Sequence, residues 1–220
     1  FGPQPRNVSD LKPEPGVVYL VDKPGAVQSV IRVGRHWVDR KDPNYLATLV
    51  GNHLLGRDFL SRLNKNLRED HGYSYGAGSN FDFRREKSIW QVSSLVRADA
   101  TAPALQEVVK ELNAISGDRP ITAEEVETAR SAEARSFPED FESPSGIAGA
   151  IAEISEFKLP LDSLQTFLPN LEKTTLDEVR KVMTEVVLPE GRYFLVVGDR
   201  KSVEPALRQA GFDKIKVITH

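Results

Sequence analysis

Residues 51–79, GNHLLGRDFLSRLNKNLREDHGYSYGAGS, constrain the fold more than any other part of the chain. Leu60, Leu63 and Leu67 recur at intervals of three and four, which is typical of one buried stripe on a helix. Gly72 is expected to end that helix, because glycine readily adopts the left-handed conformation of a C-cap. The segment that follows has the pattern of a strand. The sequence therefore predicts a helix, a tight turn and a strand in succession.

Two hydrogen-bond donors lie near the corner between this helix and strand. Arg68 lies beside the leucine stripe, about a quarter-turn away on a helix of roughly 3.6 residues per turn. Its aliphatic stem can therefore pack against the core while its guanidinium group reaches outward. Tyr75 stands near the start of the strand. Taken alone, these two residues favour a common interpretation, in which Arg68 forms a salt bridge and Tyr75 packs in the sheet.

The rest of the chain predicts an α+β fold with a two-layer arrangement. Strands are expected at residues 17–21, 26–33, 73–96 (two strands joined by a charged turn at 84–87), 193–197 and 215–218. We expect the first two strands to form a hairpin through the turn Asp22-Lys23-Pro24-Gly25. Long antiparallel hairpins build a mixed, antiparallel-rich sheet, and we expect the helices to pack largely on one of its faces.

Helix boundaries follow from capping residues. The sequence predicts helices that start at Asp42-Pro43, at Thr101, at the capping box Thr122-x-x-Glu125, around Ile147–Phe157, around Leu164–Leu168, at Thr174 or Thr175, and near Val203. Glycines are expected to end two of them, at Gly117 and Gly211. The acidic residues that follow Thr122 are interpreted as favourable charge at a helix start.

Length and charge exclude several classes of protein. The 220 residues carry a net charge of −3 with scattered Lys and Arg, so no electrostatic footprint for nucleic acid is present. No apolar run approaches the ~20 residues that span a membrane. Residues 1–16 are interpreted as a Pro-rich lead-in, linker or cut end, and residues 17–220 as a single domain. The lack of cysteine excludes thiol chemistry and disulfides.

The sequence supports neither a nucleophile elbow nor a zinc-binding histidine motif. Residues 72–76 (GYSYG) match G-x-S-x-G, but a nucleophile elbow needs a strand before the serine and a helix after it. Here the expected order is reversed. None of the four histidines lies in H-E-x-x-H or H-x-x-E-H, so no helix offers two imidazoles to zinc. His53 is interpreted as a core histidine and His71 as a solvated residue at a helix end.

The segment LLGRDFLSRLNKNLREDHGYSYG resembles the second, non-zinc (C-terminal-type) domain of pitrilysin/insulinase-type zinc peptidases, the inverzincins. The family pattern is N-x-x-L-G-G-x-F-x-S-R-L-x-x-x-L-R-E-x-x-G-x-x-Y. The matching residues are Asn52, Leu55, Gly56, Phe59, Ser61, Arg62, Leu63, Leu67, Arg68, Glu69, Gly72 and Tyr75. Arg57 replaces the second glycine of the pattern. The flanking segments VYLVDKPGAVQSVIRVG, TAEEVETAR and FLVVGD are also similar, so the resemblance covers nearly the whole chain from Val17 onward.

The resemblance implies the family's metallopeptidase unit (the LuxS/MPP-like fold) and a shared active site. Such peptidases close two of these units around an unfolded peptide, either in one chain or in a heterodimer. One unit supplies zinc through H-x-x-E-H and a further glutamate, and the other supplies an Arg and a Tyr. Those two roles pass to Arg68 and Tyr75. The zinc ligands have no counterpart here, so this chain is expected to carry no cofactor and to need a zinc-bearing homologous domain or subunit as its partner.

The implied function is the non-zinc half of a clam-shell zinc metallopeptidase that is inactive alone. Zinc activates water, and donors placed at a substrate carbonyl stabilise the charge that develops there. An extended peptide could also pair with an exposed strand edge. Two alternatives stay open: a structural assembly subunit, as in relatives that are core proteins of respiratory complexes, and a peptide-binding clamp without hydrolysis. Bacterial relatives are often periplasmic, so the resemblance favours that compartment.

Overall fold

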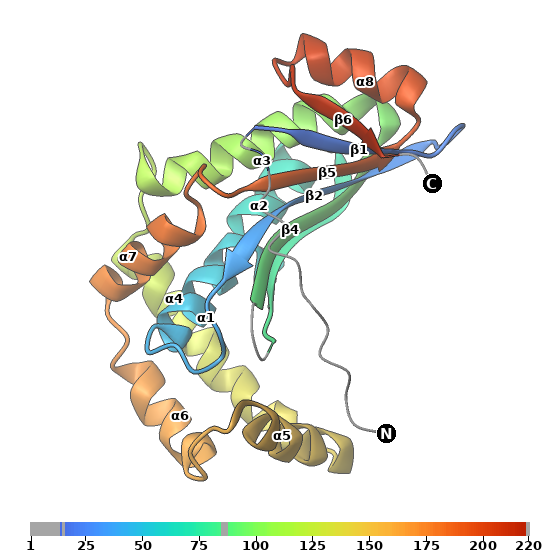
Figure 1. The fold of residues 1–220 in the computed structure, drawn as a ribbon. Coiled ribbons are helices and arrows are strands. Elements are labelled where there is room, and N and C mark those ends of the chain that lie inside the picture. The colour runs from blue at the N-terminus through green and yellow to red at the C-terminus, as the bar shows by residue number, and fades with distance from the viewer. Residues whose placement is uncertain (1–13, 15, 85–87, 219–220) are drawn as a thin grey trace, which may run out of the picture.

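The computed structural model describes residue 14 and residues 16–84 and 88–218, which form a curved sheet with helices against one face (Figure 1). The strands are β1 (Val18–Asp22), β2 (Gln28–Trp37), β3 (Ser74–Asp82), β4 (Ser88–Arg97), β5 (Tyr193–Gly198) and β6 (Ile215–Ile218). The α-helices are α1 (Tyr45–Asn52), α2 (Arg62–Asn64), α3 (Thr101–Ser116), α4 (Ala123–Ser136), α5 (Pro144–Phe157), α6 (Ser163–Glu172), α7 (Leu176–Val186) and α8 (Arg200–Gln209). Shorter helical segments are π-helical η1 (His53–Arg57) and η2 (Lys65–Asp70), and 3-10 η3 (Ala98–Ala100) and η4 (Phe137–Phe141).

The six strands form one mixed sheet in the order β3-β4-β2-β5-β1-β6. β2 pairs antiparallel with both β4 and β5, and β3 pairs antiparallel with β4. β1 pairs parallel with β5 and with β6. The predicted α+β class and antiparallel-rich mixed sheet are confirmed. The predicted Pro-rich lead-in lies outside the described residues except for Glu14 and Gly16, as does the charged turn at 84–87 except for Arg84.

The hairpin predicted from β1 and β2 is wrong, because β5 lies between these two strands. The linking residues 23–27 step over β5, and Gly25 turns the chain with a φ of 73°. Five extended residues reach about 17 Å, which exceeds the roughly 10 Å across two strand spacings. β5 has the apolar sequence YFLVVG, and its central place gives every residue from Tyr193 to Gly198 a flanking strand.

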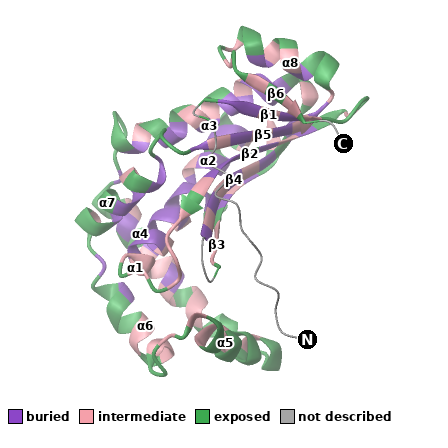
Figure 2. Ribbon diagram, viewed as in Figure 1, coloured by how far each residue is buried: buried purple, intermediate pink, exposed green. Residues whose placement is uncertain are grey.

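Alternate strand residues point toward the helices and form the main core, which is the buried centre in Figure 2. Examples from the central strands are Ile31, Val33, Val92 and Val196, all fully buried. On the helix side α3 and α7 present complementary apolar stripes; these are Leu105, Val108 and Leu112 of α3, and Val179, Val182, Met183 and Val186 of α7. α5, whose residues are all described, contributes no buried residue. Within the described residues no helix is long and apolar enough to cross a membrane.

The predicted capping box of Thr122 with Glu125 is formed at α4. Thr175, one of the two residues predicted to cap α7, is its N-cap and also forms a capping box with Glu178. The prediction of a helix start at Asp42-Pro43 is wrong by two residues. The Asp42 carboxylate instead accepts a hydrogen bond from Asn44 N at 2.8 Å, which builds a turn before α1.

Two further helix starts differ from the prediction. Thr101 is the first residue of α3 and not its cap, because η3 already leads into that helix and the Thr101 hydroxyl contacts Ala98 O and Ser29 Oγ, each at 2.8 Å. α8 begins at Arg200, three residues before Val203, because the Asp199 side chain accepts a hydrogen bond from Lys201 N at 3.0 Å and caps its first turn.

Candidate functional site

Arg68 lies near the end of the helical segment formed by α2 and η2, which packs through Leu63 and Leu67. Both leucines are fully buried, as predicted. The inclusion of Leu60 in this stripe is wrong, because its side chain is 78% exposed. The helix begins only after Ser61, which is extended with φ −60° and ψ 155°, so the helical spacing does not reach back to Leu60.

The Arg68 side chain is partly ordered by its neighbours and remains accessible. Its Cζ lies 4.2 Å from the centroid of the Phe59 ring, a cation–π distance. Its Nε lies 3.4 Å from Glu69 Oε1, and the side chain is 35% exposed. The predicted arrangement, a packed stem with an outward guanidinium group, therefore matches the geometry.

Tyr75 lies in a bulge of β3, and its side chain is 93% exposed. The register shifts between Ser74 and Ala77, so two residues of β3 face one residue of β4. The Ser74 hydroxyl stabilises the bulge: it accepts a hydrogen bond from Gly76 N at 3.0 Å and lies 2.8 Å from Leu95 O. The bulge turns the Tyr75 ring away from the sheet, so the interpretation of Tyr75 as a packed sheet residue is wrong.

A hollow of about 670 Å³ brings Arg68 and Tyr75 to one site. Its other walls come from the loop before β2 and from the end of β4; the lining residues include Val27, Gln28, Glu69, Ser74, Leu95 and Arg97. The serine of the G-x-S-x-G string follows a helix and begins a strand, so the expected reversal of the nucleophile-elbow order is confirmed. The hollow therefore offers a guanidinium and a phenol as donors, beside exposed aliphatic surface.

Two asparagines that were not predicted as site residues connect the two halves of this corner. Asn64 donates from Nδ2 to Phe59 O at 2.6 Å and accepts at Oδ1 from Ala77 N at 3.0 Å. Asn52 donates to Ser79 O at 3.0 Å and accepts from the Ser79 hydroxyl at 2.7 Å. These side chains satisfy outward-facing backbone groups of β3, so this part of the sheet edge is closed to another strand. Both asparagines lie on helix faces that are largely apolar, and this pattern could have identified them as residues that bind buried backbone groups.

Gly56 explains why the helix and the strand approach so closely. A Cβ atom at this position would lie 2.3 Å from Ser79 N, well inside van der Waals contact. The Gly56 carbonyl also faces Gly78, where an added Cβ would lie 2.7 Å from Gly56 O. The two glycines therefore allow direct backbone packing of η1 against β3. Gly72 has a φ of 61°, which confirms the predicted left-handed end of the Arg68 helix.

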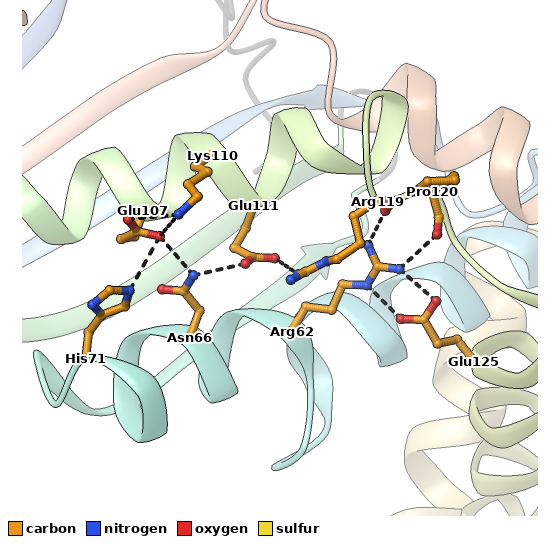
Figure 3. A network of polar contacts seen from close by, with 9 residues as sticks. All are labelled: Arg62, Asn66, His71, Glu107, Lys110, Glu111, Arg119, Pro120 and Glu125. Carbon is orange, nitrogen blue, oxygen red and sulfur yellow. Dashed lines mark hydrogen bonds and ion pairs between the residues drawn. The ribbon is translucent and has the colours of Figure 1, made fainter.

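A polar network anchors the Arg68 helix to α3 and α4 (Figure 3). Arg62 donates from Nε and Nη2 to the Glu125 carboxylate, both at 2.7 Å, and from Nη1 to Arg119 O at 2.7 Å. Asn66 donates to Glu107 at 3.0 Å and to Glu111 at 2.9 Å, and Glu111 in turn pairs with Arg119. The network fixes the helix from which Arg68 projects.

Two acids of this network, Glu125 and Glu107, are held in their ionised form. Burial opposes ionisation of Glu125, but hydrogen bonds from Arg62 and Thr122 outweigh it and lower the pKa of that carboxyl. Burial likewise opposes ionisation of Glu107, and donors on Asn66 and Lys110 leave its pKa lowered. His71 lies 3.6 Å from Glu107 and stacks on Tyr73 at a centroid distance of 5.0 Å.

The described residues do not fit a zinc ion, because no three His, Asp or Glu side chains among them come together as ligands. The partly buried His53 donates or accepts at Nδ1 with Glu133 Oε1 at 2.8 Å, which agrees with its interpretation as a satisfied histidine. His71 is exposed and follows the last residue of η2, as expected.

Comparison with known proteins identifies the family. Residues 2–133 match the model of the peptidase M16 inactive domain. The peptidase M16 inactive domain from Pseudomonas fluorescens is similar in structure, with a TM-score of 0.76 and 24% identity over 83% of this chain and 43% of that chain. A protease from Helicobacter pylori has a TM-score of 0.70 and 18% identity over 83% and 44%. A chain of complex III2 from Candida albicans has a TM-score of 0.72 and 13% identity over 90% and 49%.

The chain spans less than half the length of these structural relatives. No protein with a curated description matches the sequence. The family match confirms the resemblance carried by the segment around Arg68. The similar structures share 24% identity or less with this chain, so they establish the fold alone.

Proposed function

The chain belongs to the peptidase M16 inactive-domain family, and we propose that it is the non-zinc half of a two-part zinc peptidase, with Arg68 and Tyr75 contacting the substrate backbone. The observation that carries this proposal is that one hollow is lined by both residues, although they come from different elements. A zinc-bearing homologous domain or subunit would face this hollow. The substrate class is an extended peptide.

The donor geometry supports a role in holding carbonyl oxygens. The exposed Tyr75 hydroxyl is free to donate, and among the described residues Arg68 has a single ion pair, a 3.4 Å contact with Glu69. The guanidinium group therefore keeps N–H donors for a ligand. Donors fixed before the substrate arrives stabilise developing negative charge without reorganisation. The Ser74 bulge and the Arg62 network fix the backbone segments that carry the two donors.

A substrate strand cannot pair with the edge of β3 at residues 77–79, because Asn52 and Asn64 already bind backbone groups there. The hollow itself contains exposed Val27 and Leu95 beside the two donors. We therefore assign backbone recognition to Arg68 and Tyr75, and nonpolar contact with substrate side chains to the aliphatic wall. When bound in the partner, zinc would supply the activated water.

The test uses the native protein together with its zinc-bearing partner. Arg68→Ala and Tyr75→Phe should each lower kcat/KM for an unfolded peptide by about 10²-fold or more, the usual cost of losing one such donor. Circular dichroism and the thermal midpoint should stay unchanged, since neither side chain is buried. Tyr193→Phe and Arg208→Ala serve as matched controls, because neither residue lines the hollow.

Turnover within about threefold of wild type in both variants would contradict the role of Arg68 and Tyr75. Peptide binding that depends on both residues, without any hydrolysis by the complete assembly, would instead identify a clamp.

A structural assembly subunit is the second candidate function, because the fold also resembles a chain of complex III2. In that case neither variant would change assembly, and the native complex would lack a zinc site in the partner domain. Metal analysis of the intact complex, combined with its mass, separates the two functions. Stoichiometric zinc and peptide cleavage support the peptidase.

A further inference from the structure

A second cavity lies between α1 and α4 on one side and η4, α5 and α6 on the other. Its volume is about 360 Å³, within the range of small-molecule sites, and it shares no lining residue with the Arg68–Tyr75 hollow. Figure 1 shows α5 and α6 standing away from the sheet at this end of the molecule. The cavity is therefore distinct from the site described above.

The helix that closes this cavity is incompletely packed. Every residue of α5 is described and none is buried, as the green and pink ribbon in Figure 2 shows. Gly149 lines the cavity, and a Cβ atom added there would meet nothing within 4 Å. The surroundings of this exposed glycine are therefore open, and a ligand beside it would supply packing that α5 lacks.

One wall of the cavity is aromatic. Phe137 stacks on Phe167 with ring centroids 4.3 Å apart and an interplanar angle of 11°. Phe141 meets Phe137 edge-on at 5.0 Å. All three rings line the cavity. Such a wall favours a flat apolar group, and it also attracts cations through the ring quadrupoles.

The polar wall carries more negative than positive charge, with Glu133, Asp140 and Glu153 against Arg40 and Arg57. Both arginines are already paired: Arg40 Nε lies 2.5 Å from Glu153 Oε1, and Arg57 Nη1 lies 3.2 Å from Glu133 Oε1.

This pairing leaves one carboxylate uncompensated. Asp140, an exposed residue at the rim of the cavity, has no ion pair among the described residues. Burial raises the pKa of Tyr45 to about 12, although Arg40 opposes the shift, so this phenol is neutral and adds no charge. The lining therefore carries one more carboxylate than guanidinium group, which favours a cation over an anion.

We propose that this cavity binds a compact organic cation, an ammonium group joined by a short linker to an aromatic ring. The ring would lie against Phe137 and Phe167, and the ammonium group would lie at Asp140. Two sources share this chemistry: a free arylalkylamine, and an aromatic residue at the amino terminus of a peptide. Anionic ligands are disfavoured, because the lining carries three carboxylates against two guanidinium groups.

Isothermal titration calorimetry of the native protein tests the charge preference with three probes of similar shape. These are 2-phenylethylamine, neutral 2-phenylethanol and anionic 3-phenylpropionate. The amine should bind at least about tenfold more tightly than the alcohol, a difference within the range of cation–π and ion-pair contributions. The carboxylate should bind least tightly. Equal binding of amine and alcohol, or no binding of the amine, would overturn the proposal.

Variants locate the site. Gly149→Leu should weaken binding of the amine at least about tenfold by filling the cavity, and leucine favours the helix more than glycine does, so folding is retained. Ala152→Leu is the matched control, because Ala152 lies on α5, is exposed and does not line the cavity. Asp140→Asn should reduce the preference for amine over alcohol. Undiminished binding in Gly149→Leu would place the ligand elsewhere and refute the assignment.

The two sources are distinguished by a short peptide with an amino-terminal phenylalanine, compared in its free and acetylated forms. Tighter binding of the free peptide than of 2-phenylethylamine assigns the site to peptide amino termini. Tighter binding of 2-phenylethylamine assigns it to free amines. Tighter binding of the acetylated form than of the free peptide would contradict the proposed charge recognition.

Discussion

Removing Arg62 should destabilise the domain more than removing any exposed arginine. The Arg62 side chain is only 8% exposed, and it donates two charge-assisted hydrogen bonds to Glu125 and one each to Arg119 O and Pro120 O. Arg62→Ala leaves Glu125, whose side chain is 30% exposed, without its cation, and leaves two carbonyls without their donor.

The magnitude follows from these contacts. Hydrogen bonds to charged groups contribute about 1.5–3 kcal/mol each, and breaking a fully buried ion pair costs about 3–5 kcal/mol. Water can reach the exposed part of Glu125 and recover some of this energy, so we expect a loss of about 3 kcal/mol. For a domain of this size the thermal midpoint should fall by about 6–12 °C.

Differential scanning calorimetry of wild type, Arg62→Ala, Glu125→Ala and the double variant measures the effect and its coupling. The double variant should be less destabilised than the sum of the single variants by about 1–3 kcal/mol. Arg208→Ala, which removes an exposed pair with Glu204, should shift the midpoint by no more than about 2 °C. If Arg62→Ala behaved like Arg208→Ala, the network in Figure 3 would not hold the Arg68 helix.

Three further predictions concern backbone geometry and pH. Gly56→Ala should lower the thermal midpoint by several degrees, because its Cβ would lie 2.3 Å from Ser79 N; an unchanged midpoint would contradict the close packing of η1 on β3. Gly72→Ala should destabilise by about 1 kcal/mol, because its φ of 61° is costly for alanine, and denaturant unfolding with no loss would argue against this helix end. Because the folded-state pKa of Glu125 is lowered, its contribution is fully present above the unfolded pKa of about 4.3 and is lost as the pH falls through the folded value. The stability difference between wild type and Glu125→Gln should therefore shrink on acidification, and a difference independent of pH would refute this assignment.

Helix caps and helix ends that depend on neighbouring residues could be predicted from the sequence. Thr122 with Glu125 forms the predicted capping box, and Thr175 is one of the two residues predicted to cap α7, because a cap depends on residues only three apart. Gly72 was predictable for the same reason, since a left-handed helix end constrains a single residue. The α+β class followed from the order of the apolar runs. The selection of Arg68 and Tyr75 depended on the family motif, and their substrate-binding role remains a prediction.

Long-range packing decided the rest. The hairpin predicted from β1 and β2 was wrong because β5, some 160 residues later in the chain, inserts between them; no local pattern reports such a partner. Leu60 fits a helical spacing, yet its exposure depends on where the helix starts. The outward turn of Tyr75 depends on a bulge set by the register with β4, which is a property of two strands together. The sequence by itself determined which main elements form and how α4 and α7 are capped, because those choices are made within a few residues. Only the tertiary structure decided which strands are neighbours, which side chains meet in a hollow and where a cavity remains, because these depend on contacts between distant segments.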